Sequence, residues 1–389
     1  MSKRHYPDFQ KYLEDAKKYN VIPVYSERAA DFETPLSIFI KSKANFLLES
    51  VEKGENVGRY SFIALGNKCT IKAAGKNFSL AENNGESSLK ISRNAPNPLL
   101  EVRKYFSRFQ SPSYEGLPPF FGGAIGYIGY EASQYFENVP VREDKEGIPD
   151  LLMVIPEAVL VYDSVKRTVS LMVTTFPRER PKEAFQRAVQ VIEELEGRLC
   201  QNLKLPAHEP PGRWSEFRSN MSKANFLEGV KKCKAYIQDG EVIQVVLSQK
   251  FRFTLEADMF DIYKALRIIN PSPYLFFLDF DDFILMGSSP EVMVKLQNKE
   301  LLIKPIAGTR PRGATVSEDN VMARELLRDE KERAEHIMLV DLARNDLGRV
   351  SKPGSVEVTD FMSIEKYSHV MHIVSTVKSE IDSPRTSLT

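Results

Sequence analysis

Two glutamates three residues apart, Glu332 and Glu335, are the first candidates for chemistry in this sequence. They stand in DEKERAEH, a charged segment that runs into the apolar IMLVDLA, and the pattern predicts a long helix over residues 321–347. In a helix both carboxylates lie on one face, where their charges repel. Three interpretations fit them: a solvated face paired with Lys331 and Arg328, an acid/base pair, or oxygen ligands for a hard cation such as Mg²⁺. The pattern alone favours the solvated face.

Two arginines, Arg310 and Arg312, follow a predicted strand in PIAGTRPRG (305–313). Two guanidinium groups beside a hydroxyl and a Gly-Thr turn suit a carboxylate or phosphate ligand. A solvated basic loop has the same spacing, so the residues alone leave both interpretations open.

The remaining motifs give weaker signals. FGGAIGYIGYE (121–131) lacks the Gly-Lys-Ser/Thr ending of a phosphate-binding loop, which favours glycines that allow close strand packing. His372 lies in YSHVMHIVSTV, for which we predict a closing helix over 367–380. A lone histidine in an apolar helix is more often a core residue than a catalyst. No Ser-His-Asp or Cys-His order stands out, so hydrolytic nucleophile chemistry has no support.

The composition excludes several classes of protein. The chain has 389 residues, with 53 basic and 53 acidic side chains and a formal net charge of +0. This balance argues against broad affinity for nucleic acid or an anionic membrane, and no apolar run is long enough to span a bilayer. The three cysteines, Cys69, Cys200 and Cys233, have no zinc-type spacing and fit a reducing compartment. With a charged N-terminus that lacks an apolar signal core, these features predict a cytoplasmic protein.

The elements that must position these residues are mostly short strands. Strand-like runs follow one another from residue 21 to 175, and an amphipathic helix follows over 181–200. A Pro-rich linker is predicted at 205–220, then a helix capped by Ser222, then a strand over 242–255 that begins VIQVVLSQ. Further strand candidates are YLFFLDF, FILMGSS, VMVKLQ and LLIKPIAG. Strands outnumber helices without a regular βαβ alternation, which favours an α+β fold.

In order along the chain, these motifs resemble the large subunits, component I, of anthranilate synthase in the chorismate-utilising enzyme family. The resemblance covers almost the whole chain. Its motifs are LLES, GRYSFI, FGGAIGYIGYE, GEVIQVVLSQ, NPSPY, SSPE, PIAGTRPRG, EKERAEHIMLVDLARNDLGRV and YSHVMHIVSTV. It implies large, mostly antiparallel sheets in a two-subdomain sandwich covered by helices. It also implies a sheet-rich regulatory region at 1–205 and a chorismate-binding region at 220–389.

The resemblance implies a site for chorismate and Mg²⁺. Glu335 matches a metal-ligating glutamate and Glu332 its acidic neighbour in the same helical turn. The metal would bridge these carboxylates and the ring carboxylate of chorismate, stabilising charge as the 4-hydroxyl leaves. Thr309 matches a residue that lines the substrate site, with Gly308 and Arg310 beside it.

Three further positions bear on the reaction. His372 matches the family histidine beside the departing groups, a candidate acid/base. Gln244 stands where family members that add water carry a lysine general base, and Ala307 where aminodeoxychorismate-forming relatives usually carry lysine. The resemblance therefore implies addition of ammonia, supplied by a glutamine amidotransferase subunit, at C2 of chorismate. Pyruvate elimination would then give anthranilate. Aminodeoxychorismate synthase component I is the alternative within the family.

A regulatory site for tryptophan is implied by two short motifs. Glu49 and Ser50 of LLES would hold the amino-acid head group, while Pro273 and Tyr274 of NPSPY would pack against the indole. Without the resemblance, a strand end that meets a proline turn explains the same residues.

Family members continue beyond the equivalent of the last helix predicted here. Their additional segment carries a second metal-binding glutamate and a glycine-rich turn that binds a carboxylate. We therefore expect this chain to lack the C-terminal segment of the family and to be nearly inactive alone. A non-catalytic remnant that binds tryptophan or a partner is the alternative from another functional class.

Overall fold

The computed structural model of the protein describes residues 5–50, 58–83, 88–140, 146–177, 180–203, 212–367 and 369–382. The chain divides into two units, one of Met1–Leu203 with Leu266–Thr389 and the other of Lys204–Ala265. The predicted linker at 205–220 lies partly outside the described residues. Within them, no helix is long and apolar enough to cross a membrane.

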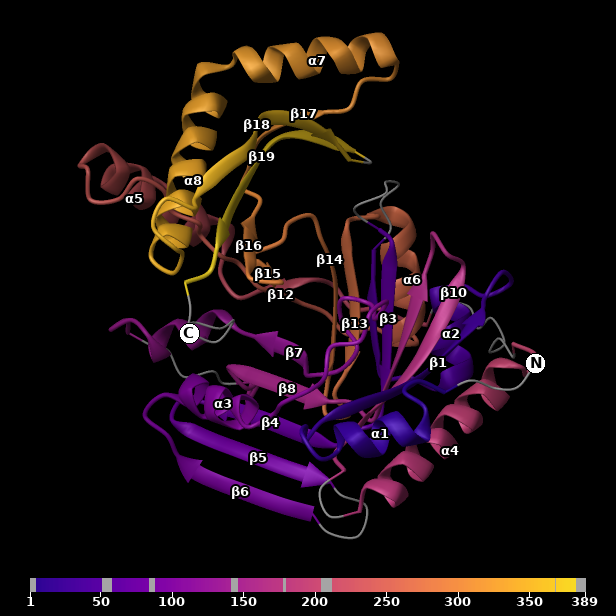
Figure 1. Ribbon diagram of the computed structural model, residues 1–389. Coiled ribbons are helices and arrows are strands. Elements are labelled where there is room, and N and C mark those ends of the chain that lie inside the picture. The colour runs from indigo at the N-terminus through magenta and orange to yellow at the C-terminus, as the bar shows by residue number, and fades with distance from the viewer. Residues whose placement is uncertain are drawn as a thin grey trace. The chain divides into compact units, whose positions relative to one another are not determined.

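The larger unit is built around a seven-stranded antiparallel sheet with the order β1-β10-β9-β3-β2-β13-β14 (Figure 1). Its strands are β1 (Ile22–Ala29), β2 (Phe46–Glu49), β3 (Tyr60–Leu65), β9 (Ala158–Asp163), β10 (Thr168–Thr175), β13 (Tyr274–Asp279) and β14 (Ile284–Ser289). β2 pairs with β13, with Glu49 opposite Leu275. Strands from both of the regions inferred from the sequence, 1–205 and 220–389, therefore share one sheet.

Three helices pack beside this sheet or on one another: α1 (Phe9–Asp15), α2 (Pro35–Ser42) and α4 (Pro181–Leu199). α4 packs against β1 and β10, and α2 packs against β3. The buried side chains of α4 include Ile192, Leu195 and Leu199, which recur at helical spacing on one face. The amphipathic helix predicted over 181–200 is confirmed.

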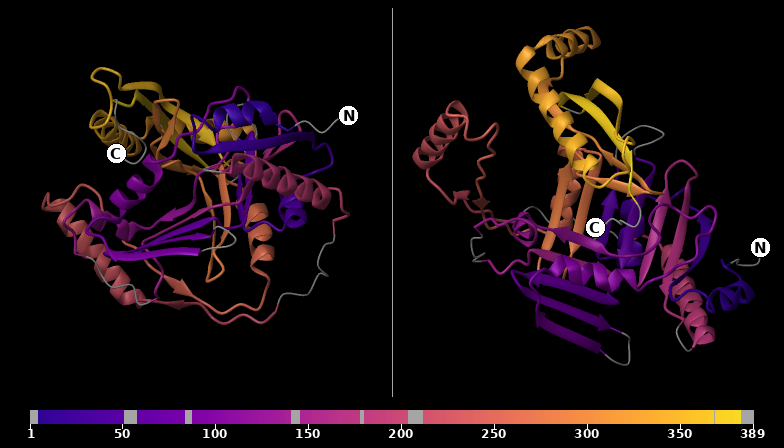
Figure 2. Two further views of the ribbon diagram at one scale, coloured as in Figure 1. Left: turned by 60° about the horizontal axis from the view of Figure 1, so that its bottom comes forward. Right: turned by 60° about the vertical axis from the view of Figure 1, so that its left-hand side comes forward.

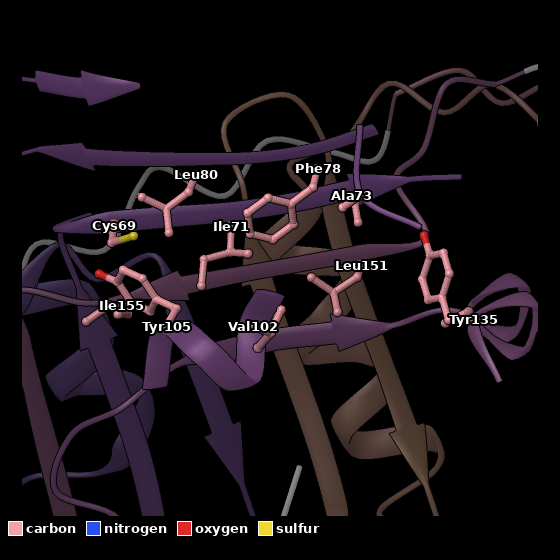
Figure 3. Packing of buried hydrophobic residues seen from close by; sticks show 12 residues of the cluster. Cys69, Ile71, Ala73, Phe78, Leu80, Val102, Tyr105, Tyr135, Leu151 and Ile155 are labelled. Atoms are coloured by element: carbon pink, nitrogen blue, oxygen red, sulfur yellow. The ribbon is translucent and has the colours of Figure 1, made fainter. Parts of the chain in front are cut away.

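A second antiparallel sheet, of five strands, has the order β6-β5-β4-β8-β7. The elements of this region are β4 (Cys69–Ala74), β5 (Asn77–Asn83), β6 (Ser88–Asn94), α3 (Pro98–Ser107), β7 (Ile125–Ile128), the short 3₁₀ helix η1 (Tyr130–Tyr135) and β8 (Leu151–Ile155). Figure 3 shows Val102 and Tyr105 of α3 packing on side chains of this sheet. Leu152 and Val154 of β8 share a buried cluster with Val161 of the seven-stranded sheet. The two sheets thus form a sandwich, and the α+β prediction is confirmed.

The glycine cluster at 121–131 supplies β7. A Cβ at Gly126 would lie 2.0 Å from the carbonyl oxygen of Leu152 on the neighbouring strand. Only glycine allows this approach, which supports the interpretation that the cluster serves close packing.

The third sheet of the larger unit has the order β15-β16-β19-β17, and β18 also pairs with β19. Its strands are β15 (Lys295–Gln297), β16 (Glu300–Ile303), β17 (Ile306–Pro311), β18 (Glu357–Lys366) and β19 (Val370–Glu380). The helices α7 (Val316–Arg328) and α8 (Glu330–Gly348) pack against β17 and β19. Figures 1 and 2 show α8 running beside β19. This sheet and α8 carry most of the predicted site.

The predicted closing helix over 367–380 is wrong, because these residues form β19. Met371, Ile373 and Val377 are buried at alternate positions, which is strand periodicity. The segment is rich in β-branched residues, which fit a pleated surface better than a helix. A short apolar run is ambiguous between the two structures, and pairing with β16, β17 and β18 decides it here.

The single helix predicted over 321–347 is also corrected, because the structure has two helices that meet at Asp329. Asp329 has an extended backbone (φ −68°, ψ 113°), and its side chain accepts a hydrogen bond from the backbone N–H of Glu332. It therefore caps the N-terminus of α8, and a cap residue interrupts helical hydrogen bonding. In a segment with so many charges, the sequence did not show which acid would cap.

The smaller unit holds α5 (Lys223–Gln238), a two-stranded pair of β11 (Arg218–Ser219) and β12 (Phe251–Arg252), and the start of α6 (Met259–Ile269). Ser222 caps α5, as predicted. The strand predicted over 242–255 is reduced to β12, and Ile243 and Val246 are largely exposed. A strand requires a neighbour for its N–H and C=O groups, and no described residue pairs with 242–249.

Candidate functional site

His372 and Thr309 lie opposite each other on the antiparallel strands β19 and β17. Nδ1 of His372 is 3.0 Å from Oγ1 of Thr309 and 3.2 Å from the carbonyl oxygen of Gly308. A carbonyl can only accept, so this geometry favours the tautomer with hydrogen on Nδ1. Nε2 is then left with a lone pair and makes no hydrogen bond to a described residue. An imidazole held in this way can take up or release a proton at Nε2.

A bulge in β17 sets this geometry. The pairing with β19 shifts between Ala307 and Thr309, and Gly308 between them has φ +78°. A Cβ at Gly308 would lie 3.2 Å from Ile373 and 3.3 Å from the side chain of Glu332. Glycine is thus required both by the left-handed backbone and by the close approach of α8. The carbonyl group of Gly308 faces His372, and its Cα faces Glu332.

Arg310 is engaged with the start of α8. Its Nη2 donates to Oδ2 of Asp329 at 2.7 Å, and its Nη1 lies 3.6 Å from Oε1 of Glu332. The backbone N–H of Glu332 and, secondarily, the guanidinium of Arg310 lower the pKa of Asp329. Arg310 therefore holds the first turn of α8 against β17, which the sequence did not indicate. The predicted contact of Arg310 with substrate stays a prediction.

The two candidate metal ligands lie one helical turn apart on α8. Both Glu332 and Glu335 are partly buried, and Glu332 is the one that reaches Gly308. Among the residues that the structure describes, no group of three or more His, Cys, Asp or Glu side chains is placed to hold a metal. Mg²⁺ is commonly bound by one or two carboxylates that share it with waters and an anionic substrate. These two oxygen donors fit that chemistry.

Arg312 anchors the loop that follows β17. Its Nε lies 3.0 Å from both carboxylate oxygens of Asp319, its Nη2 lies 2.6 Å from Oδ2, and its Nη1 donates to the carbonyl oxygen of Tyr367. With the N–H of Gly313 as a second donor, this bidentate pair lowers the pKa of Asp319 to about 2. Of the two arginines in PIAGTRPRG, Arg312 is therefore saturated by internal contacts.

Sequence reasoning missed the pair of His336 and Ser375. Nε2 of His336 is 2.6 Å from Oγ of Ser375, which also accepts from the backbone N–H of Met362. Both side chains are fully buried, and burial lowers the pKa of His336. One signal could have predicted the burial of His336: it stands directly before the apolar half of α8. Its neighbour Glu335 lies on a different part of the helix surface.

The residues of the predicted tryptophan site come together at the end of β2. Antiparallel pairing of Glu49 with Leu275 places Ser50 beside Tyr274. Glu49 is buried, and its Oε2 lies 3.2 Å from Nε of Arg267, an ion-pair distance without hydrogen-bond geometry. Oγ of Ser50 is buried and has no hydrogen-bond partner among the described residues. Such an orphaned hydroxyl is costly unless a ligand satisfies it.

Gln244 is exposed and belongs to the smaller unit. Its predicted role stays a prediction.

The candidate site therefore combines the Thr309–His372 pair on two neighbouring strands with the partly buried glutamates at the start of α8. The chain belongs to the family of chorismate-binding enzymes, whose family model matches residues 43–389. The resemblance seen in the motifs is confirmed.

Curated relatives and solved structures agree with this family. The chain is 43% identical over 385 residues to anthranilate synthase component 1 of Aquifex aeolicus, with 95% of this chain and 76% of that one covered. It is 40% identical over 391 residues to anthranilate synthase component 1 of Acetivibrio thermocellus, with 98% and 78% covered. The crystal structure of anthranilate synthase component I from Streptococcus pneumoniae matches with a TM-score of 0.71 and 34% identity, covering 87% of this chain and 72% of that chain. The isochorismate synthase MenF from Escherichia coli, at 12% identity and a TM-score of 0.62 over 97% and 76%, shares the fold.

Proposed function

We propose that this protein acts as component I of an anthranilate synthase, converting chorismate and ammonia to anthranilate, pyruvate and water. The observation that carries the proposal is the hydrogen-bonded pair of Thr309 and His372. The pair lies at the β17 bulge, and the carboxylate of Glu332 approaches the same bulge at Gly308. The identity of 43% to the Aquifex aeolicus enzyme supports the choice of reaction within the family.

The reaction forms one carbon–nitrogen bond and breaks two carbon–oxygen bonds. Ammonia bonds to C2 of chorismate as the C4–O bond breaks and the hydroxyl leaves as water. A base then removes the C2 proton as the ether C3–O bond breaks, which leaves an aromatic ring. The departing enolpyruvate takes up one proton at its methylene carbon and becomes pyruvate. Nε2 of His372, with Nδ1 fixed by Gly308 and Thr309, can hold the proton exchanged beside these departing groups. Mg²⁺ held by Glu332 and Glu335 would supply charge stabilisation to the substrate carboxylate and the leaving hydroxyl.

Product analysis tests this proposal. Purified protein is incubated with chorismate, ammonium and Mg²⁺, anthranilate is followed by its fluorescence, and pyruvate is measured by reduction with lactate dehydrogenase. Chorismate binding is measured in parallel by calorimetry with and without Mg²⁺. Anthranilate and pyruvate are expected in equal amounts and at a low rate, because the motif comparison predicts a chain that is nearly inactive alone. Aminodeoxychorismate without pyruvate would support the alternative within the family, and Mg²⁺-dependent chorismate binding without any turnover would contradict the proposed reaction.

We further propose that tryptophan binds at the end of β2 and inhibits the reaction. The buried carboxylate of Glu49 would pair with the amino group, the hydroxyl of Ser50 would gain the partner it lacks, and Tyr274 would pack against the indole. Calorimetry with tryptophan and with indole-3-propionate, which lacks the amino group, separates these contacts. We expect tryptophan alone to bind, and Ser50→Ala to weaken it by about 5-fold, since a net hydrogen bond contributes about 1 kcal/mol. Equal binding of both compounds would contradict the role of Glu49.

The ammonia is proposed to come from a glutamine amidotransferase subunit in a hetero-oligomer, in a cytoplasmic setting. The relatives' name, component 1, supports a second component. The purified chain should use ammonium but not glutamine, and a complex isolated with an amidotransferase subunit should use both. Glutamine-dependent synthesis by the chain alone would refute the need for the partner.

A further inference from the structure

A cavity of about 680 Å³ opens in the larger unit on elements other than β17, β19 and α8. It lies at the ends of β4, β5, β8 and β10, between α3 and the first half of α4. Figure 3 shows part of its lining, with the hydroxyl of Tyr105 turned towards Cys69 and Ile155 alongside. A cavity of this size is typical of small-molecule sites.

One side of the cavity is aromatic. Phe109 and Phe176 both line it, with ring centroids 5.5 Å apart. Tyr105 lies beside them, 5.2 Å from Phe109 in an edge-to-face arrangement. These rings offer an apolar surface on which a flat organic group can pack.

The cavity is also rich in cations. Four cationic side chains and two carboxylates line it: Lys68, Arg108, Arg180, Arg187, Glu82 and Glu157. Arg108 is neutralised by Glu82 at 2.6 Å. Arg180 lies 3.4 Å from Glu183 on the surface of α4. These two arginines have carboxylate partners of their own.

Lys68 and Arg187 have no such partner. Nζ of Lys68 donates to the carbonyl oxygen of Thr174 at 2.7 Å, and no carboxylate of the described residues lies within ion-pair distance of it. Burial lowers the pKa of Lys68 to about 8, with Glu157 opposing the shift and Arg187 adding to it. Arg187, at the rim, makes no ion pair or hydrogen bond with a described residue. An ammonium in this setting leaves two of its three donors available.

We propose that this cavity binds a small organic anion, with its acidic group on Lys68 and Arg187 and its flat apolar body on Phe109 and Phe176. The aromatic wall selects against inorganic anions, and the cations select against neutral aromatics. The site is separate from the residues assigned to chorismate and to tryptophan, so the inference stands independently of the proposed reaction.

The test uses 2-naphthoate, a fluorescent aromatic carboxylate, titrated into the full chain by fluorescence and calorimetry. Two further compounds each keep one feature of this ligand. 2-Naphthalenemethanol keeps the aromatic rings without the charge, and inorganic phosphate keeps the negative charge without the rings. Lys68→Met removes the charge at nearly constant volume. Lys72→Met is the control, because Lys72 lies on β4, the strand that begins just after Lys68, and pairs with Asp282 at an exposed position. Arg187→Met provides a second variant. Arg187 is exposed, so its replacement does not change the packing of the protein interior.

We expect 2-naphthoate to bind the wild-type chain and Lys68→Met to weaken it by about 10- to 100-fold, the range for loss of a charge-assisted hydrogen bond. Arg187→Met should weaken it less, Lys72→Met should leave it unchanged, and the alcohol and phosphate should bind at least about 10-fold more weakly. No binding of 2-naphthoate overturns the proposal. Binding that is unaffected in both Lys68→Met and Arg187→Met also overturns the proposal. So does binding that is lost only in a further variant, Arg310→Met, because that loss would place the anion at the β17 site.

Discussion

Two histidines, His336 on α8 and His372 on β19, make the same kind of contact in opposite environments. Each lies within 3.0 Å of a hydroxyl oxygen, His336 of Ser375 on β19 and His372 of Thr309 on β17. His336 is completely buried under β19, whereas His372 is half-buried and its Nε2 makes no hydrogen bond to a described residue.

The difference separates a structural histidine from a chemical one. A buried imidazole without a counter-ion is held neutral, because burial lowers its pKa, and it can only join α8 to β19. A half-buried imidazole, fixed at one nitrogen and open at the other, can exchange protons with a bound molecule. The variants below test whether His372 acts in the chemistry and His336 only in the structure.

Apart from the replacement of His372 itself, the largest effect is expected at Glu335, the neighbour of His336 along α8. Glu335→Gln keeps the size of the side chain and removes the charge that would hold Mg²⁺. We expect kcat/KM for chorismate to fall by about 10²- to 10³-fold, since metal stabilisation of charge contributes several kcal/mol. Glu330→Gln, at an exposed position on the first turn of α8, is the control. If the rate of Glu335→Gln depended on the Mg²⁺ concentration as the wild-type rate does, Glu335 would not be a ligand of the metal.

A smaller effect is expected at Thr309, the partner of His372. Thr309→Val keeps the shape and removes the hydroxyl, while the carbonyl of Gly308 still accepts from Nδ1. The loss of one hydrogen bond should lower kcat by about 10-fold, with the free energy of unfolding changed by less than about 0.5 kcal/mol at this exposed side chain. Thr359→Val on β18 should change neither quantity. A large loss of stability in Thr309→Val would show a structural role instead.

The smallest effect on catalysis is expected at His336. His336→Leu should leave kcat within about twofold and lower the free energy of unfolding by about 1–3 kcal/mol, because the buried hydroxyl of Ser375 loses a partner. Ser375→Ala should cost a similar amount, and the double variant should cost less than the sum, since the two residues share one contact. Denaturant unfolding measures all three. Additive losses would mean that the pair is not coupled.

The sequence predicted much of the framework because several of its signals are local. Ser222 at a helix start, the spacing of apolar residues in α4 and the glycine cluster of β7 each act within a few residues. The strand β19 was mistaken for a helix because its structure depends on pairing with β16 and β17, far earlier in the chain, as well as with the adjacent β18. Its β-branched residues were the available signal.

The site was predictable in its residues but not in its contacts. Motifs placed Thr309 and His372 in one site, and pairing of β17 with β19 brings them together. They did not show that Arg312 is saturated by Asp319 or that Arg310 bonds to the cap of α8. Such ion pairs join groups whose approach is set by the folded backbone, so composition and spacing cannot assign them.

The account is tested most directly by the rate of anthranilate formation in two matched variants, His372→Asn and His336→Asn, measured with chorismate, ammonium and Mg²⁺ in one assay. If His372 is the acid/base of the site and His336 a structural link, His372→Asn lowers kcat by about 10²- to 10⁴-fold at unchanged thermal stability. In the same assay His336→Asn stays within about twofold of the wild-type rate. Equal losses in both variants, or full activity in His372→Asn, would contradict the assignment.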